Sequence, residues 1–448
     1  MYNTATIAAV ATAPGPGAIG IVRVSGSKCA EIVRRVAERL PVPRYASLQR
    51  MFDLQHQPID RGLVLYFPAP ASYTGEDMVE FHTHGGPIVL ARMLQAIYAA
   101  GAEPARPGEF TQRAFLNGKI DLLQAEAVAD LITSSTERSL RAANLAISGR
   151  FSTAINAISQ ALVEARSLLE ATIDFGDELS VNQDTPLLYE STQTLRIEIQ
   201  ALLKNARQGA QLARGLRVVL IGRPNSGKST LLNALSGHNR AIVSDKPGTT
   251  RDILLTEVDI EGLLVTFLDT AGLHDTLEEI EREGIRRAMQ EVATADLIFC
   301  VYDATEPRPE MADLLTPDQI YPSAIIYVRN KIDRLGENPA VHLAGEYTEV
   351  SISAKEGTGI EALRAALLKV MAIDTDSDSP LLARARHLNA LRIALEMLEF
   401  STPIEFWRDP VESAERLRIA HQALGELTGE FTNEDMLGEI FSRFCIGK

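Results

Sequence analysis

The sequence predicts a multidomain α/β protein: an α+β domain, then a helical bundle, with a doubly wound parallel-sheet domain inserted into the helical part. Three observations lead to this prediction. The 448 residues are enough for about three domains. Apolar residues make up 46% and charged residues 23% of the chain, which is typical of globular proteins. The character of the sequence also changes near residues 120, 213 and 376.

Residues 1–119 form the predicted α+β domain. Short apolar runs at 19–24 (IGIVRV) and 62–67 (GLVLYF) are typical of strands, and 31–40 and 88–100 are typical of helices. This block holds 12 basic and 9 acidic residues, although the whole chain has a net charge of −15. The acidic total excludes a protein coated in positive charge for nucleic acid. The N-terminal block either carries an ordinary solvated surface or binds an anionic ligand.

Residues 120–212 and 376–448 form the two predicted parts of the helical domain. In the first part, apolar residues recur at spacings of four and three: Phe151, Ile155, Ile158, Leu162, Ala165 and Leu169. This spacing places them on one side of a long helix. A bundle core explains the seam more simply than a partner-binding stripe does. Residues 372–380 have the composition of a linker.

Residues 213–375 form the predicted inserted domain. Continuous apolar runs at 217–221, 264–268, 297–301 and 324–328 suit strands of a parallel sheet that are buried on both faces. The segments between these runs are long enough for helices, so the pattern indicates a doubly wound fold.

The cellular compartment follows from the cysteines and the apolar segments. Cys29, Cys300 and Cys445 are too few and too far apart for a disulfide framework or a zinc site. The N-terminus lacks the basic start of a signal peptide, and no uncharged apolar run reaches about 18 residues. We therefore expect a cytoplasmic protein without a membrane span.

Residues 222–229 read GRPNSGKS, directly after an apolar run and before a helical segment. This is the G-x-x-x-x-G-K-[ST] pattern in the strand–loop–helix setting that it requires. Backbone N–H groups of such a loop surround phosphate oxygens, Lys228 reaches the β- and γ-phosphates, and Ser229 can bind Mg²⁺. The predicted nucleotide contacts here are Asn225, Ser226, Gly227, Lys228, Ser229 and Thr230.

Three further motifs follow in the order that GTPases have. DTAG at 269–272 would hold Mg²⁺ through water and sense the γ-phosphate, and GTTRD at 248–252 offers a threonine for Mg²⁺ in a switch loop. In NKID at 330–333, the Asp333 carboxylate can accept two hydrogen bonds from the guanine edge, which adenine lacks. These motifs, with SAK at 353–355 behind the base, predict a GTPase with contacts at Asp269, Thr270, Ala271, Gly272, Asn330, Lys331, Asp333, Ser353 and Ala354.

The residue after DTAG is Leu273, where Ras has a glutamine that orients the attacking water. Leucine cannot do this. The acidic run that follows contains Glu278, Glu279, Glu281 and Glu283, and one of them can position or activate water. A solvated switch helix explains the others.

With these motifs in place, the chain resembles the MnmE (TrmE) family of tRNA-modification GTPases over essentially its whole length. The most specific segments are 74–87 (TGEDMVEFHTHGGP), 106–132 (RPGEFTQRAFLNGKIDLLQAEAVADLI), GTTRD and 444–448 (FCIGK). The resemblance implies a homodimer whose N-terminal domain binds 5-formyl- or methylene-tetrahydrofolate. It also implies potassium-stimulated GTP hydrolysis and a partner, the FAD protein MnmG, in a heterotetramer or larger complex. Together the two proteins would add a carboxymethylaminomethyl or aminomethyl group to C5 of the wobble uridine of certain tRNAs.

The resemblance also assigns roles to residues. It implies Glu281 as the catalytic glutamate and Thr250 as a second Mg²⁺ ligand beside Ser229. It implies K⁺ ligands at Asn225, Ser244, Lys246 and Thr249, and GTP contacts along Ser244, Asp245, Lys246, Pro247, Gly248, Thr249 and Thr250. It implies folate contacts at Arg23, Glu80, Lys119 and Lys448. A carboxylate such as that of Glu80 can accept two hydrogen bonds from a pterin, and basic residues suit the glutamate tail of folate.

Several positions keep more than one interpretation. Cys445 is a buried structural cysteine, or a prenylated one (a terminal lysine argues against this), or a thiol that acts at the folate site. His82 and His84 have the spacing of metal ligands, but a turn or the wall of the folate pocket explains them better. Pro247 next to Lys246 stiffens the potassium loop, so potassium affinity can differ from that of relatives.

Two other functions compete with the one that the resemblance implies. A ribosome-assembly GTPase would need an RNA-binding module, and no GXXG loop in a suitable setting follows residue 375. A folate-dependent one-carbon transferase with a merely structural GTPase domain is disfavoured by the intact nucleotide motifs.

Overall fold

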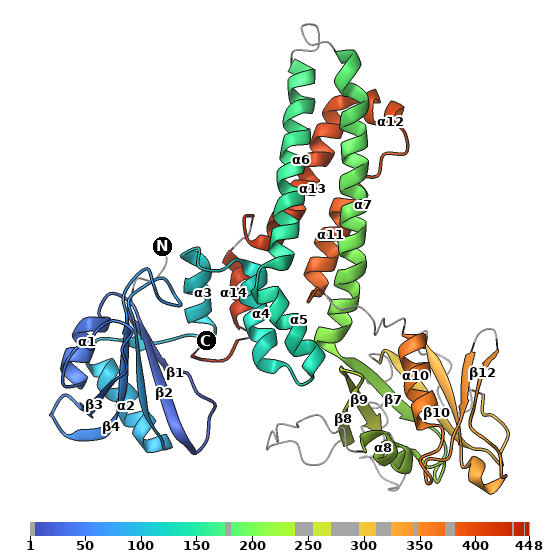
Figure 1. The fold of residues 1–448 in the computed structure, drawn as a ribbon, viewed down its shortest axis with the longest axis horizontal. Coiled ribbons are helices and arrows are strands. Elements are labelled where there is room, and N and C mark those ends of the chain that lie inside the picture. The colour runs from blue at the N-terminus through green and yellow to red at the C-terminus, as the bar shows by residue number, and fades with distance from the viewer. Residues whose placement is uncertain are drawn as a thin grey trace, which may run out of the picture. The chain divides into compact units, whose positions relative to one another are not determined.

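The computed structural model describes residues 5–174, 181–237, 254–269, 295–310, 324–344, 347–371, 381–431, 434–442 and 444–447. Its contacts divide the chain into two units. The first comprises Met1–Ala129, Ile147–Leu195 and Glu396–Lys448, and the second comprises Asp130–Ala146 and Arg196–Leu395. Each unit contains a sheet and helices (Figure 1), so the predicted multidomain α/β class is confirmed.

The sheet of the first unit has six strands in the order β3-β4-β5-β2-β1-β6. Neighbouring strands are antiparallel except β1 and β6, which are parallel. The predicted strands at 19–24 and 62–67 lie within β2 and β4. The six strands are β1 (Ile7–Val10), β2 (Gly17–Ser25), β3 (Ser47–Phe52), β4 (Pro58–Phe67), β5 (Met78–Gly85) and β6 (Glu103–Pro104).

Helices α1 (Cys29–Val36) and α2 (Pro87–Ala99) cover one face of this sheet (Figure 1). The core between them is formed by alternate strand residues and by one side of each helix, including Val22, Val24, Phe81, Ile32, Met93 and Ile97. Helix α1 ends at Val36, whereas the sequence predicts residue 40, because Ala37 is extended and forms a bridge with Met51. Strand pairing thus ends this helix earlier than its composition suggests.

The remaining helices outside the second sheet are α3 (Glu109–Leu116), α4 (Leu122–Thr133), α5 (Glu137–Ile147), α6 (Arg150–Asp174), α7 (Val181–Arg214), α11 (Ala385–Met397), α12 (Pro403–Arg408), α13 (Pro410–Thr428) and α14 (Glu434–Ser442). Helices α6 and α13 pack along each other (Figure 1). The predicted seam from Phe151 to Leu169 lies entirely on α6, and all six of its residues are buried. It is therefore a core, as the spacing predicts.

The sheet of the second unit has seven strands in the order β12-β13-β11-β10-β7-β9-β8. The five inner strands are parallel, and β8 and β12 are antiparallel edges. All four predicted buried strands are present. The strands are β7 (Leu216–Ile221), β8 (Leu254–Ile260), β9 (Leu263–Asp269), β10 (Leu297–Asp303), β11 (Ile325–Asn330), β12 (Ala340–Ala344) and β13 (Tyr347–Ser351), with helices α8 (Lys228–Ser236) and α10 (Ile360–Val370) beside them.

Among the described residues, no helix is both long enough and apolar enough to cross a membrane.

Candidate functional site

The loop between β7 and α8 is shaped by close backbone contacts. A Cβ on Gly222 would lie 2.1 Å from the Val301 carbonyl oxygen, and one on Gly227 would lie 2.3 Å from the Asn330 side-chain nitrogen. Both positions, and Asn225 with φ 63°, have positive φ, which glycine adopts without a penalty. The loop therefore curls tightly before α8 begins at Lys228, and it leads into a helix N-terminus that attracts anions.

The charged and hydroxyl side chains of this loop lie at the start of α8. Lys228 is 4% exposed, and its ammonium group donates to the carbonyl oxygens of Gly222 at 2.8 Å and Arg223 at 3.1 Å. Ser229 and Thr230, in the first turn of the helix, are exposed. A buried cation held inside a loop of backbone amides is a phosphate-binding arrangement.

Asn330 joins three of the sequence motifs. Its side-chain nitrogen donates to the Ser226 carbonyl at 2.9 Å, and its side-chain oxygen accepts from the backbone N–H of Ala354 at 3.0 Å. Next to it, the Lys331 ammonium group donates to the Asn225 carbonyl at 2.5 Å. The glycine-rich loop, NKID and SAK are thus brought into one cluster.

Asp333 lies in a short 3-10 helix, Ile332–Arg334, that follows β11. One of its carboxylate oxygens accepts a hydrogen bond from the Ser353 hydroxyl at 2.6 Å. Ser353 itself is fully buried. The serine of SAK therefore orients the carboxylate that the sequence assigns to guanine recognition.

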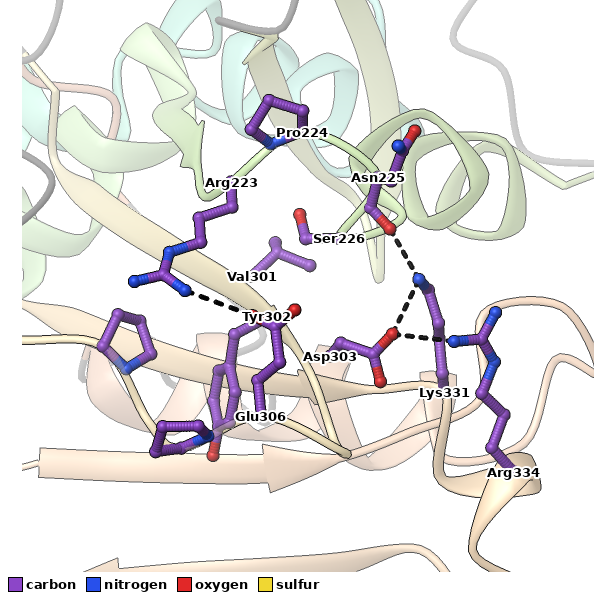
Figure 2. A pocket seen from close by; sticks show the side chains of 12 residues that line it. Arg223, Pro224, Asn225, Ser226, Val301, Tyr302, Asp303, Glu306, Lys331 and Arg334 are labelled. Carbon is purple, nitrogen blue, oxygen red and sulfur yellow. Dashed lines mark hydrogen bonds and ion pairs between the residues drawn. The ribbon is translucent and has the colours of Figure 1, made fainter.

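The sheet order explains why these segments meet. The glycine-rich loop, Asp269, NKID and SAK follow the C-terminal ends of the parallel strands β7, β9, β11 and β13. In open α/β sheets, ligands bind at this edge. Beside the glycine-rich loop a cavity of about 230 Å³ is lined by Asn225, Ser226, Tyr302, Asp303, Lys331, Arg334 and six others (Figure 2).

Many predicted site residues lie outside the described residues. These are Ser244, Asp245, Lys246, Pro247, Gly248, Thr249, Thr250, Thr270, Ala271, Gly272, Leu273, Glu278, Glu279, Glu281, Glu283 and Lys448, together with the linker 372–380. Their predicted roles stay predictions.

Sequence reasoning missed Asp303 and Arg334 at the nucleotide edge. The Asp303 carboxylate binds the Lys331 ammonium group at 2.9 Å and the Arg334 guanidinium group at 3.0 Å. Burial acts to raise the pKa of Asp303, but hydrogen bonds from Lys331 and Thr305 outweigh it and lower the pKa to about 2. The sequence signal was available: Asp303 is an acidic residue at the end of an otherwise apolar strand (LIFCVYD).

A second polar cluster lies on the sheet of the first unit. Arg23 on β2 and Glu80 on β5 are register partners. The Arg23 guanidinium group donates twice to one Glu80 oxygen, at 2.8 and 3.1 Å, and His82 contacts the other at 3.1 Å. Burial acts to raise the pKa of Glu80, but the Arg23 charge and the hydrogen bonds from His82 and Arg23 outweigh it and hold the pKa below its usual value.

Aromatic rings and the C-terminal segment enclose Arg23. Its guanidinium group lies 5.7 Å from the Tyr73 ring centre and 5.8 Å from that of Phe110, and it donates to the Gly447 carbonyl at 3.4 Å. A Cβ on Gly447 would lie 2.1 Å from the Val10 carbonyl oxygen. The C-terminal segment therefore lies directly on β1, beside the Arg23–Glu80 pair.

The other predicted residues of the first unit have contacts of their own. Cys445 is exposed, and its carbonyl accepts from the Gly108 N–H at 3.4 Å, so its prediction as a buried structural cysteine is wrong. The Lys119 ammonium group donates to the Pro70 carbonyl at 3.1 Å. His84 pairs with Asp60 at 2.8 Å. Within the described part of the chain, no three His, Cys, Asp or Glu residues form a metal-binding group.

An ion pair and a hydrogen bond join two of the segments that carried the family resemblance. Arg113, with a side chain 7% exposed, contacts Glu76 and Glu109 at 3.0 Å each. Its guanidinium group also donates to the Ala5 carbonyl at 2.8 Å. In addition, the Asn117 side chain donates to the Thr74 carbonyl at 2.7 Å. These polar residues connect the segment 74–87 to α3.

The other two cysteines are structural. Cys29 and Cys300 are buried, and burial raises the pKa of both thiols, that of Cys300 to about 12. They therefore stay protonated and unreactive at neutral pH.

The chain is similar to several known proteins. Two family models match the chain: the MnmE helical domain over residues 122–445 and the GTP-binding protein TrmE N-terminus over residues 6–119. A tRNA modification GTPase MnmE from Methylococcus capsulatus is 45% identical over 444 residues, which are 99% of this chain and 98% of that protein. The protein of the same name from Azoarcus sp. is 46% identical over 448 residues, with the same coverage. Among solved structures, an Era variant of Aquifex aeolicus bound to GDP and AlF4⁻ is 28% identical and covers 42% of this chain and 69% of that one, with a TM-score of 0.26.

Proposed function

Because the chain belongs to the tRNA modification GTPase MnmE family, it is a GTPase, and we propose that it hydrolyses GTP to GDP and phosphate in support of tRNA modification. With the FAD protein MnmG, it adds a carboxymethylaminomethyl or aminomethyl group to C5 of the wobble uridine of certain tRNAs, and the one-carbon unit comes from tetrahydrofolate. The chemistry of the nucleotide is assigned to the second unit and that of folate to the first.

One observation carries the GTPase part of the proposal. Asn330 connects the glycine-rich loop to SAK, and Ser353 orients the Asp333 carboxylate. A carboxylate presents two acceptors to the paired donors of guanine, so this arrangement selects GTP over ATP. Lys228 is held among the carbonyl groups of the loop, from which its charge can stabilise the phosphates.

The residues present fit the two cations that the family implies. The Ser229 hydroxyl is exposed at the first turn of α8, and the Asn225 side chain is exposed on the loop. Hydroxyl and amide oxygens suit hard cations. We assign Mg²⁺ to Ser229 and Thr250, and K⁺ to Asn225, Ser244, Lys246 and Thr249. When bound, these ions neutralise charge on the phosphates.

Water activation is assigned to Glu281, because Leu273 cannot orient a water molecule. A carboxylate near the γ-phosphate can hold the attacking water by accepting its proton in a hydrogen bond. Ordering of the switch loops on GTP binding and their release after hydrolysis move the GTPase domains, and the helical domain relays this motion to the modification site.

The Arg23–Glu80 pair is the proposed folate site, with Lys119 and Lys448. Glu80 accepts the two hydrogen bonds of the pterin, one on each oxygen, in place of those from Arg23 and of the contact with His82. Tyr73 and Phe110 stand beside Arg23, which favours a planar ring system there. The docked C-terminal segment supports a role for Cys445 as a thiol at this site, since Gly447, two residues later, contacts Arg23.

The assembly is proposed to be a cytoplasmic homodimer that joins MnmG in a heterotetramer or larger complex and acts on tRNA. The N-terminal sheet supports dimerisation because three apolar residues, Leu48, Leu63 and Ile21, lie with His82 in one cross-strand row on its face opposite the helices. Leu48 pairs with Leu63, Leu63 with His82, and His82 with Ile21; Leu48 is 55% exposed. We also propose that the chain divides into domains at 1–119, 120–212, 213–375 and 376–448, where the character of the sequence changes.

GTP turnover in KCl and in NaCl tests the proposal. We expect potassium to accelerate hydrolysis, and Asn225→Ala to remove this gain. Glu281→Ala should lower turnover about 10²–10⁴-fold while a fluorescent GTP analogue binds with wild-type affinity. Glu278→Ala, in the same acidic run, is the matched control and should be active. Equal rates in both salts with no effect of Asn225→Ala or Glu281→Ala would instead favour a ribosome-assembly switch.

A further inference from the structure

The order of the strands places Asp303 between the glycine-rich loop and NKID. Strand β10 lies between β7, which leads into the glycine-rich loop, and β11, which ends in NKID. All three strands are parallel, so their C-terminal ends meet at one edge. The last residue of β10 is Asp303, and its register partner on β11 is Asn330.

The Asp303 carboxylate uses both of its oxygens. Oδ1 accepts from the Thr305 backbone N–H at 3.0 Å and from the Thr305 hydroxyl at 2.9 Å. Oδ2 accepts from the Lys331 ammonium group at 2.9 Å and from the Arg334 guanidinium group at 3.0 Å. The first pair fixes the carboxylate to the turn that follows β10, so the second oxygen has a defined position toward NKID (Figure 2).

Lys331 extends from Asp303 to the glycine-rich loop. Its ammonium group contacts Asp303 and the Asn225 carbonyl, as the two dashed lines at its tip show (Figure 2). The Lys331 side chain is only 22% exposed, and that of Asp303 only 10%. Charge-assisted hydrogen bonds in such a half-buried setting are stronger than those in open solvent.

We propose that Asp303 is a positioning residue of the guanine-nucleotide site, which acts by holding Lys331 against the Asn225 carbonyl. With Lys331 held in this way, the NKID segment and the glycine-rich loop keep their separation before the nucleotide arrives. The nucleotide then binds to a site that is already arranged, so less conformational entropy is lost on binding. Arg334 supports the same carboxylate from the solvent side. The inference rests on the proposed GTP site.

The test uses the full-length protein and a fluorescent GDP derivative. Asp303→Asn retains the oxygen that accepts from Thr305 and places a donor amide opposite Lys331, so the lysine loses its acceptor. We expect the Kd for the GDP derivative to rise about tenfold, the value of one charge-assisted hydrogen bond. At saturating GTP, kcat should stay within about twofold of wild type, because Asp303 touches no reacting atom.

Glu337→Gln is the matched control. It removes an ion pair with Arg329 on β11, which does not contact the glycine-rich loop. This variant should bind the GDP derivative as wild type does. A melting temperature measured for both variants separates general destabilisation from the specific effect on binding.

The decisive measurement repeats Asp303→Asn in a Lys331→Met background. If Asp303 acts through Lys331, the substitution changes the Kd less than about twofold there. An equal loss in both backgrounds, or no loss in the wild-type background, overturns the inference while the GTP site stands. Failure of the wild-type protein to bind the GDP derivative would overturn the proposed function itself.

Discussion

The carboxylates of the nucleotide site and of the proposed folate site differ in their hydrogen-bond partners. Asp303 and Asp333 each rest on a hydroxyl of the inserted domain, Thr305 and Ser353 respectively, so they are oriented before a ligand binds. Glu80 instead already accepts two hydrogen bonds from Arg23 on one oxygen and contacts His82 through the other. The Asp333 carboxylate therefore needs no rearrangement to bind guanine. A folate ligand at Glu80 would have to replace existing partners, which makes the free energy of binding less favourable.

Asp333→Asn should change the preferred base. An amide cannot accept both guanine hydrogen bonds, but it can donate to the carbonyl that xanthine carries in place of the guanine amino group. We expect the Kd for GTP to rise at least about a hundredfold, from the loss of hydrogen bonds to a charged group, and XTP to become the better substrate. Hydrolysis assays with both nucleotides measure this. Unchanged preference for GTP would exclude Asp333 from base recognition.

The Glu80 ion pairs should make the stability of the N-terminal domain depend on pH. The pKa of Glu80 is below its usual 4.5 in the folded protein, so the ionised form stabilises the fold above that pH. This contribution is lost as the pH falls from about 4.5 through the lowered folded pKa. We expect the difference in urea midpoint between wild type and Glu80→Gln to be largest at neutral pH and to shrink below pH about 4.5. A constant difference would contradict the linkage.

Among the elements, α6 and the C-terminal segment show how packing positions the sites. Helix α6 buries its seam against α13, and Phe441 and Phe444 pack with Leu122 in one cluster. Because these apolar contacts hold α14 and the residues after it, the segment around Cys445 reaches Arg23 as part of the fold.

Leu162→Ala should destabilise the bundle. Leu162 is fully buried in the α6 seam, and truncation of a buried leucine costs about 2–5 kcal/mol. Leu168→Ala on the same helix, at a position 44% exposed, is the matched control and should cost less than about 1 kcal/mol. Urea unfolding followed by far-UV circular dichroism measures both. Equal costs would mean that the seam is not the core.

Gly447→Ala should detach the C-terminal segment. The position has φ 94°, and the new Cβ would lie 2.1 Å from the Val10 carbonyl oxygen, a clash with backbone that only movement of the segment can relieve. We expect faster hydrogen exchange in residues 444–447 and weaker binding of 5-formyltetrahydrofolate. Gly438→Ala, where nothing lies within 4 Å of the added Cβ, is the control. If folate affinity is unchanged, the segment is not part of the site.

For the whole molecule, the proposed homodimer requires a surface that joins two copies. The row Leu48–Leu63–His82–Ile21 lies on the outer face of the N-terminal sheet, next to the row that carries Glu80 and Arg23. Burial of this row in the proposed homodimer would place a second copy beside the proposed folate site and exclude water from that site.

If the proposed homodimer forms through this row, Leu63→Glu should convert it to a monomer, because a buried carboxylate without a partner is strongly unfavourable. Light scattering on the purified protein measures the mass. The control is Leu343→Glu on the edge strand β12, at a position 63% exposed, and it should stay dimeric. A dimeric Leu63→Glu protein would move the interface elsewhere.

Features that depend on local spacing could be predicted from the amino-acid sequence alone. The glycine-rich loop, NKID and SAK are short motifs whose chemistry follows from adjacent residues, and the α6 seam follows from a repeat along one helix. Only the tertiary structure decided which distant residues meet. Asp303 reaches Lys331 because β10 lies between β7 and β11, and Gly447 reaches Arg23 across most of the chain. Such contacts depend on strand order and long-range packing, which no local pattern encodes.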